Sequence, residues 1–84
     1  MWFRKKEKKF MFHEDRDAAF EPLVDFLSDE FNNELDFDKT IEQYMYMCHD
    51  NEETYYYKHF GTREYFNIFD DGSTEGELED WRKW

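Results

Sequence analysis

The sequence predicts an α+β fold, in which one main amphipathic helix packs on a small antiparallel sheet. Apolar residues recur at helical spacing in the first half of the chain, and short aromatic runs separated by turn residues follow. Nineteen of the 84 residues are Phe, Tyr or Trp, and disordered chains are poor in these residues. We therefore expect residues 1–84 to form a single small acidic domain.

The chain begins with a basic segment. Residues 1–9 carry five basic residues and one acidic residue, a net charge of +4, and we call them the basic arm. The apolar run from Phe10 to His13 predicts an edge strand and is too short for an export signal. No run approaches the ~20 apolar residues of a membrane span. We expect a cytoplasmic protein that does not bind membranes.

A helix is predicted from about Asp17 to Glu34. Its apolar residues recur at steps of three and four and form a narrow stripe, namely Phe20, Leu23, Val24, Leu27, Phe31 and Leu35. Proline is best tolerated in the first turn of a helix, so Pro22 predicts a start near Phe20–Glu21. Asn32-Asn33 is the predicted end.

Residues 39–69 have two interpretations. The favoured one is three strands, at Ile41–Cys48, Thr54–Phe60 and Arg63–Phe69, with turns at 49–53 and Gly61-Thr62. Helical spacing from Ile41 to Cys48 and a capping signal at Asn51 support the alternative, a small all-α bundle. Strands are favoured because three consecutive tyrosines would surround a helix with rings.

The C-terminal segment predicts a turn followed by a short helix. Asp70-Asp71-Gly72-Ser73 has turn composition, and Thr74-x-x-Glu77 matches a capping box. A helix from Glu75 to Trp84 would direct Leu78 and Trp81 inward.

Charge is the main functional signal. Residues 10–84 contain 21 acidic and 6 basic residues, a net charge of −15. Such a surface repels nucleic acid and attracts basic surfaces. We therefore expect no direct binding of nucleic acid and a basic protein as the partner.

The acids are arranged in clusters. A stripe of Asp17, Glu21, Asp25 and Asp29 places carboxylates about 6 Å apart along a helix, at a repulsive spacing. Glu30, Glu34, Asp36 and Asp38 extend it, and a second cluster, with no basic residue within it, comprises Asp70, Asp71, Glu75, Glu77, Glu79 and Asp80. Carboxylates crowded in this way should have raised pKa values. One interpretation is a row of carboxylates in place of nucleic-acid phosphates, and the other is a solvated face.

No enzymatic site is predicted. Cys48, His49 and His59 lack the spacing of metal ligands, and we expect a buried thiol with two surface histidines. The three glycines stand apart and form no phosphate-binding loop. The sequence predicts no catalytic residue, no metal and no cofactor.

The aromatic content predicts an interface. Four Leu, two Ile and one Val accompany the nineteen rings, more rings than one small core needs. Some rings should contact a partner or a second copy of the chain in a homodimer. The expected anchors are Tyr55, Tyr56, Tyr57 and Trp81.

In its size, acidity and aromatic richness, the chain resembles small phage-encoded inhibitors, among them nucleic-acid mimics. The resemblance concerns general character and implies a non-enzymatic acidic inhibitor that blocks a basic nucleic-acid-binding protein in the host cytoplasm during host takeover. The alternative is a protein–protein inhibitor or regulator, for example of RNA polymerase, that binds through an aromatic surface, with its acidity serving solubility.

Overall fold

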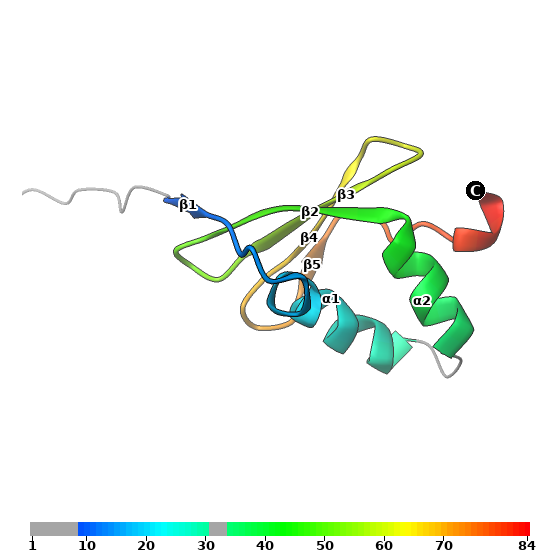
Figure 1. Ribbon diagram of the computed structural model, residues 1–84, viewed down its shortest axis with the longest axis horizontal. Coiled ribbons are helices and arrows are strands. Elements are labelled where there is room, and N and C mark those ends of the chain that lie inside the picture. The colour runs from blue at the N-terminus through cyan, green and yellow to red at the C-terminus, as the bar shows by residue number, and fades with distance from the viewer. Residues whose placement is uncertain (1–8, 31–33) are drawn as a thin grey trace, which may run out of the picture.

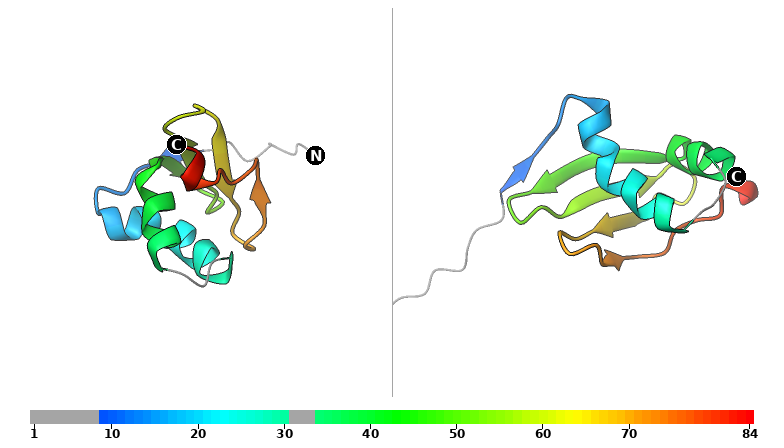
Figure 2. Two further views of the ribbon diagram at one scale, coloured as in Figure 1. Left: turned by 90° about the vertical axis from the view of Figure 1, so that its right-hand side faces the viewer. Right: turned by 90° about the horizontal axis from the view of Figure 1, so that it is seen from below.

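A computed structural model describes residues 9–30 and 34–84, and the side chains of residues 30 and 34–36 lie outside the description. In this part of the chain, a five-stranded antiparallel sheet has the order β1-β2-β3-β4-β5, and both α-helices pack on one of its faces (Figures 1 and 2). The elements are β1 Phe10–Met11, α1 Arg16–Glu30, α2 Glu34–Glu42, β2 Tyr44–Asp50, β3 Tyr55–His59, β4 Tyr65–Ile68, β5 Thr74–Glu75 and the 3₁₀-helix η1 Trp81–Lys83. The α+β prediction is confirmed, and the all-α alternative is wrong.

Helix α1 begins earlier than predicted. The Asp15 carboxylate accepts a hydrogen bond from the Asp17 N–H at 3.2 Å, and its carbonyl accepts one from the Ala19 N–H at 3.0 Å. Asp15 therefore caps the helix, and Pro22 lies in the second turn rather than the first. A proline there removes one helical hydrogen bond. Burial of Leu23 on the sheet offsets that cost.

The structure describes a second helix, α2, where the sequence predicted the end of one helix and the start of a strand. Helix α1 ends at Glu30 and α2 starts at Glu34, while Phe31, Asn32 and Asn33 lie outside the described residues. Ile41, expected to open a strand, packs on the core from α2. Strand β2 accordingly starts at Tyr44.

A β-bulge explains the mixed periodicity of β2. Tyr46 pairs with Tyr57 and Cys48 with Tyr56, so Met47 is the extra residue. Beyond the bulge, His49 pairs with Tyr55 on the face that carries the helices. The inserted residue interrupts strict alternation, which is why this segment also has helical spacing.

The core is largely aromatic, as the composition predicted. Its buried members are Leu23, Leu27, Tyr44, Tyr55, Tyr57, Phe66 and Ile68. The Tyr57 hydroxyl donates to the Ala19 carbonyl at 2.7 Å and so joins β3 to α1. Tyr55 and Tyr57 face the helices and Tyr56 faces the other way, which is the strand alternation expected for these residues.

The predicted C-terminal helix is mostly wrong. Thr74 and Glu75 form β5 and pair with Ile68 and Asn67, so Thr74 does not cap a helix. Gly76 has φ +94°, which ends the strand. Helical structure in this segment is limited to η1, where the Asp80 carboxylate accepts a hydrogen bond from the Arg82 N–H. None of the described helices is long and apolar enough to cross a membrane.

Candidate functional site

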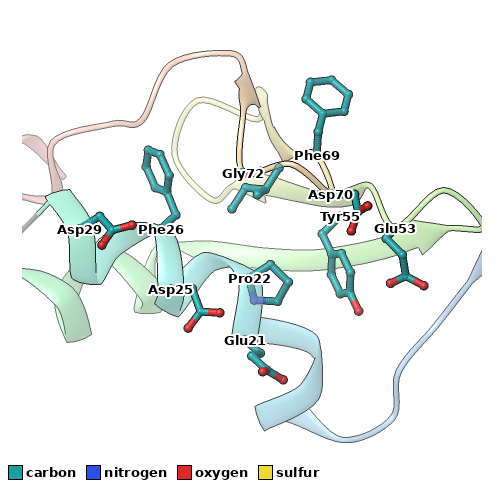
Figure 3. Close-up of a pocket in the computed structure, with 11 residues that line it drawn as sticks. Glu21, Pro22, Asp25, Phe26, Asp29, Glu53, Tyr55, Phe69, Asp70 and Gly72 are labelled. Atoms are coloured by element: carbon teal, nitrogen blue, oxygen red, sulfur yellow. The ribbon is translucent and has the colours of Figure 1, made fainter.

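An acidic groove of about 350 Å³ lies between α1 and two turns at one end of the sheet (Figure 3). Helix α1 contributes Glu21, Asp25 and Asp29, the β2–β3 turn contributes Glu53, and the β4–β5 turn contributes Asp70. Among the described residues, those that line the groove include no lysine, arginine or histidine. Five carboxylates from three separate segments therefore share one concave surface.

The rest of the groove is apolar and aromatic. Its other lining residues are Pro22, Phe26, Tyr55, Ile68, Phe69 and Gly72. Burial raises the pKa of Tyr55, and the negative charges of Glu53 and Glu21 raise it further, so its hydroxyl stays protonated at neutral pH. Carboxylates beside aromatic rings are the arrangement that binds a guanidinium or ammonium group.

The predicted stripe borders this groove. Asp17, Glu21, Asp25 and Asp29 are all exposed on α1. Glu21 also lines a second hollow of about 600 Å³ between α1 and α2, together with Asp17 and the predicted Asp38. The stripe therefore runs between two acidic hollows. Arg16 lies in the second of them, with its guanidinium 5.6 Å from the centre of the Phe20 ring.

Only one member of the second predicted cluster lines the acidic groove. Asp70 lines the acidic groove, whereas Asp71, Glu75, Glu77, Glu79 and Asp80 line neither hollow. Asp80 pairs with Arg82 at 3.0 Å, so this cluster is partly neutralised. Glu30, Glu34 and Asp36 have side chains outside the described residues.

The pKa expectation is wrong for two of these carboxylates. Hydrogen bonds from the Ser73 side chain and backbone lower the pKa of Asp71. Hydrogen bonds from Arg82 lower the pKa of Asp80. Local donors therefore outweigh crowding at both positions.

The predicted aromatic anchors are divided among different environments. Tyr57, which the sequence predicted as an anchor for a partner, is fully buried and belongs to the core, so its ring is not available for such a contact. Tyr55 is buried too but lines the acidic groove. Tyr56 donates to Asp50 at 2.8 Å, and burial and this carboxylate raise its pKa to about 12. Trp81 is half-buried in η1, where its carbonyl accepts from the Gln43 side chain.

Glu53, Phe26 and Phe69 were not predicted as site residues. The missing signal was the topology. In an antiparallel meander, alternate turns lie at the same end of the sheet, so the β2–β3 and β4–β5 turns meet. A sequence that predicts three strands and their turns could have placed Glu53 beside Asp70 on this ground.

The histidines were also misplaced, because His49 and His59 are buried rather than exposed. Cys48 is half-buried, and burial and Asp50 raise the pKa of its thiol, which disfavours the reactive thiolate. Among residues 9–30 and 34–84, no group of three His, Cys, Asp or Glu side chains is placed to hold a metal ion. The comparisons with protein families, curated proteins and solved structures gave no match for this chain.

We expect the stripe to be dispensable for folding. Changing Asp17, Asp25 and Asp29 to asparagine and Glu21 to glutamine together removes like-charge pairs worth about 0.2–0.5 kcal/mol each, and all four side chains are exposed. The variant should unfold at the same temperature as the wild type or a higher one, measured by circular dichroism. A variant that fails to fold would mean that these carboxylates stabilise the native state.

Proposed function

We propose that the protein is a non-enzymatic acidic inhibitor that occupies the basic surface of a nucleic-acid-binding protein. The observation that carries this proposal is the acidic groove, whose described lining includes five acidic residues and no basic one, namely Glu21, Asp25, Asp29, Glu53 and Asp70. The stripe continues the negative surface beyond the groove to Asp17. Lysines and arginines that bind phosphates would meet carboxylates instead.

The lining of the groove favours arginine as the group that enters it. A guanidinium group can pair with carboxylates on both walls while its flat face stacks on a ring such as Phe26 or Tyr55. Lysine, a compact and strongly hydrated charge, gains less from the aromatic wall. The proposal therefore specifies a partner whose nucleic-acid site is rich in arginine.

The first test measures binding of a blocked hexa-arginine peptide by calorimetry. Glu21→Gln, Asp25→Asn and Asp29→Asn together should weaken binding roughly tenfold, because three partly exposed ion pairs at about 0.5 kcal/mol each are lost. The control variant Glu42→Gln, Glu64→Gln and Glu77→Gln loses the same charge at exposed positions outside the groove. Equal weakening in both variants would mean that total charge, rather than the groove, binds the peptide.

The second test addresses mimicry. A basic partner captured with the full chain should release DNA or RNA when this protein is added, and the competition should weaken as salt rises. Neutralising the stripe should slow association more than it speeds dissociation. A partner that holds nucleic acid and this protein together would contradict mimicry.

Exposed aromatic side chains support a second candidate, a regulator that binds a protein through rings. Phe10, Phe12 and Phe60 are each more than 60% exposed, and Trp84 is 58% exposed. An aromatic interface of this kind would persist at high salt concentration, whereas binding of a basic partner to the acidic groove would be lost at that salt concentration. Sedimentation should show whether a second copy of the chain covers these rings.

A further inference from the structure

The basic arm joins the described part of the chain beside the acidic groove. Its last residue, Lys9, is held at the β2–β3 turn, where its carbonyl accepts a hydrogen bond from the Asn51 N–H at 3.0 Å. The Lys9 N–H donates to Oδ1 of Asn51 at 3.1 Å. Glu53, two residues further along the same turn, lines the groove. Figure 2 shows β1, which follows Lys9, at the end of the sheet where the β2–β3 and β4–β5 turns lie.

The arm is long enough to extend along the groove. An extended chain spans at most about 3.3–3.6 Å per residue, so the eight residues before Lys9 can reach roughly 26 Å. The wall formed by α1 runs from Glu21 to Asp29, roughly 12 Å at 1.5 Å per helical residue. The reach is about twice the length of this wall, which leaves several residues to cross from the turn to the helix.

The arm also carries the charge that the groove lacks. Residues 1–8 contain four basic residues and one acidic residue, a net charge of +3. Five acidic residues and no basic residue line the groove within the described part of the chain. Five of the six basic residues that follow the arm contact rings or carboxylates outside the groove, namely Arg16, Lys39, Lys58, Arg63 and Arg82. The main concentration of positive charge that remains in the sequence is therefore the arm.

The apolar part of the groove matches the arm too. The half-buried rings of Phe26 and Phe69 line it, and Trp2 and Phe3 precede the basic residues of the arm. Basic residues beside aromatic ones suit a surface in which carboxylates alternate with rings.

We propose that the basic arm occupies the acidic groove of its own chain, so that a basic partner binds there only by displacing the arm. The first half of this inference stands on the attachment, the reach and the charges, and the second half rests on the proposed function and adds its regulation. A segment tethered close to its site is present there at an effective concentration in the millimolar range, so even a weak contact is populated. The apparent affinity for a partner then falls with the fraction of chains whose groove is free.

The tests use two variants of the full chain that lose the same charge. The arm variant combines Lys5→Gln, Lys6→Gln and Lys8→Gln. The control variant combines Lys39→Gln, Lys58→Gln and Lys83→Gln, three positions that do not line the groove. Each variant changes the formal net charge from −11 to −14.

NMR tests the contact directly. At low salt concentration, the amide signals of Glu53, Asp70 and Gly72 should shift in the arm variant relative to wild type, because its arm holds the groove more weakly. The control variant should leave these three signals in place. At about 1 M salt, where charges are screened within about 3 Å, the arm variant and wild type should agree at these residues.

Hexa-arginine binding tests the displacement. The dissociation constant of the arm variant should be at least about threefold lower than that of the control variant, because the peptide no longer competes with the arm. Equal dissociation constants in the two variants would mean that net charge alone sets the affinity, and they would overturn the displacement.

The outcomes separate this inference from the proposed function. Groove signals that do not change in the arm variant would overturn the inference, while hexa-arginine binding to wild type would still support the proposed function. Failure of wild type and of the arm variant to bind hexa-arginine would overturn the proposed function, and shifted groove signals would still place the arm in the groove. Shifts that depend on protein concentration, together with a dimer in sedimentation, would identify the arm of a second copy as the occupant and contradict the inference.

Discussion

Replacing Asp50 by alanine should destabilise the protein by about 3 kcal/mol or more, a large part of the stability of a small domain. The Asp50 side chain is fully buried at the end of β2. Its carboxylate accepts hydrogen bonds from the Glu52 N–H at 2.9 Å, the Thr54 N–H at 3.0 Å and the Tyr56 hydroxyl at 2.8 Å. Alanine would leave these donors without their acceptor in the turn that carries Glu53. The free energy of unfolding in urea measures the effect.

Asp71 offers a matched control. Its carboxylate accepts from the Ser73 N–H at 2.9 Å in the β4–β5 turn, and so repeats the local bond that Asp50 makes to Glu52. Asp71 is exposed, however, and water can replace its contribution. Asp71→Ala should therefore cost less than about 1 kcal/mol. Similar losses for both variants would show that burial of Asp50 is not what makes it important.

Stability should fall as the pH is lowered from 7.5 to 5.5, chiefly because of His59. Its Nδ1 accepts from the Gly61 and Thr62 N–H groups, each at 3.0 Å, which requires the neutral ring. Burial lowers the pKa of His59, with Glu79 acting in the opposite direction. In the unfolded chain the pKa of this histidine is about 6.5, so below that pH the unfolded state binds more protons than the folded state. The stabilisation from the neutral His59 ring is therefore complete above that pH and is lost as the pH falls through the folded pKa. His49 contributes in the same direction.

The loss is limited to about 1.4 kcal/mol per pH unit for each histidine that stays neutral in the folded state. In His59→Asn, an amide oxygen can replace Nδ1 as the acceptor, while the ring contacts with Tyr44 and Trp84 disappear. This variant should be less stable at pH 7.5 by about 1–3 kcal/mol but should lose less on acidification. Urea unfolding at both pH values measures this, and a wild type that gains stability at pH 5.5 would contradict the assignment.

The sequence predicted the fold class because its strongest patterns were local. The helical spacing of apolar residues from Phe20 to Leu27 predicted a helix, and three consecutive tyrosines predicted a strand. Boundaries were less predictable. The bulge at Met47 mixes two periodicities, and the Thr74-x-x-Glu77 pattern competes with pairing to β4, which forms instead. In both cases long-range pairing decided the outcome, and local pattern does not encode that pairing.

Only part of the candidate site was predicted, because the rest also depends on long-range contacts. The carboxylates of α1 follow from helical spacing alone. Their proximity to Glu53 and Asp70 depends on how two hairpins stack against the helix. The burial of Tyr57 and of the histidines depends on which face of the sheet the helices cover. Composition provided the sign of the charge, whereas the groove is a property of the tertiary structure.

The order of the strands has a consequence for synthesis of the chain. Strands β2 to β5 follow one another through short turns, whereas β1 pairs with the far end of β2 after a long helical connection. There the Asn51 side chain accepts a hydrogen bond from the Lys9 N–H, 42 positions away in sequence. At about 5–20 residues per second, a ribosome needs roughly two to eight seconds to translate the intervening segment. Throughout that time Phe10, Met11 and Phe12 have no strand to pair with. Lys8 and Lys9 directly precede this apolar run, and charged residues at such a position act as gatekeepers against aggregation of nascent chains.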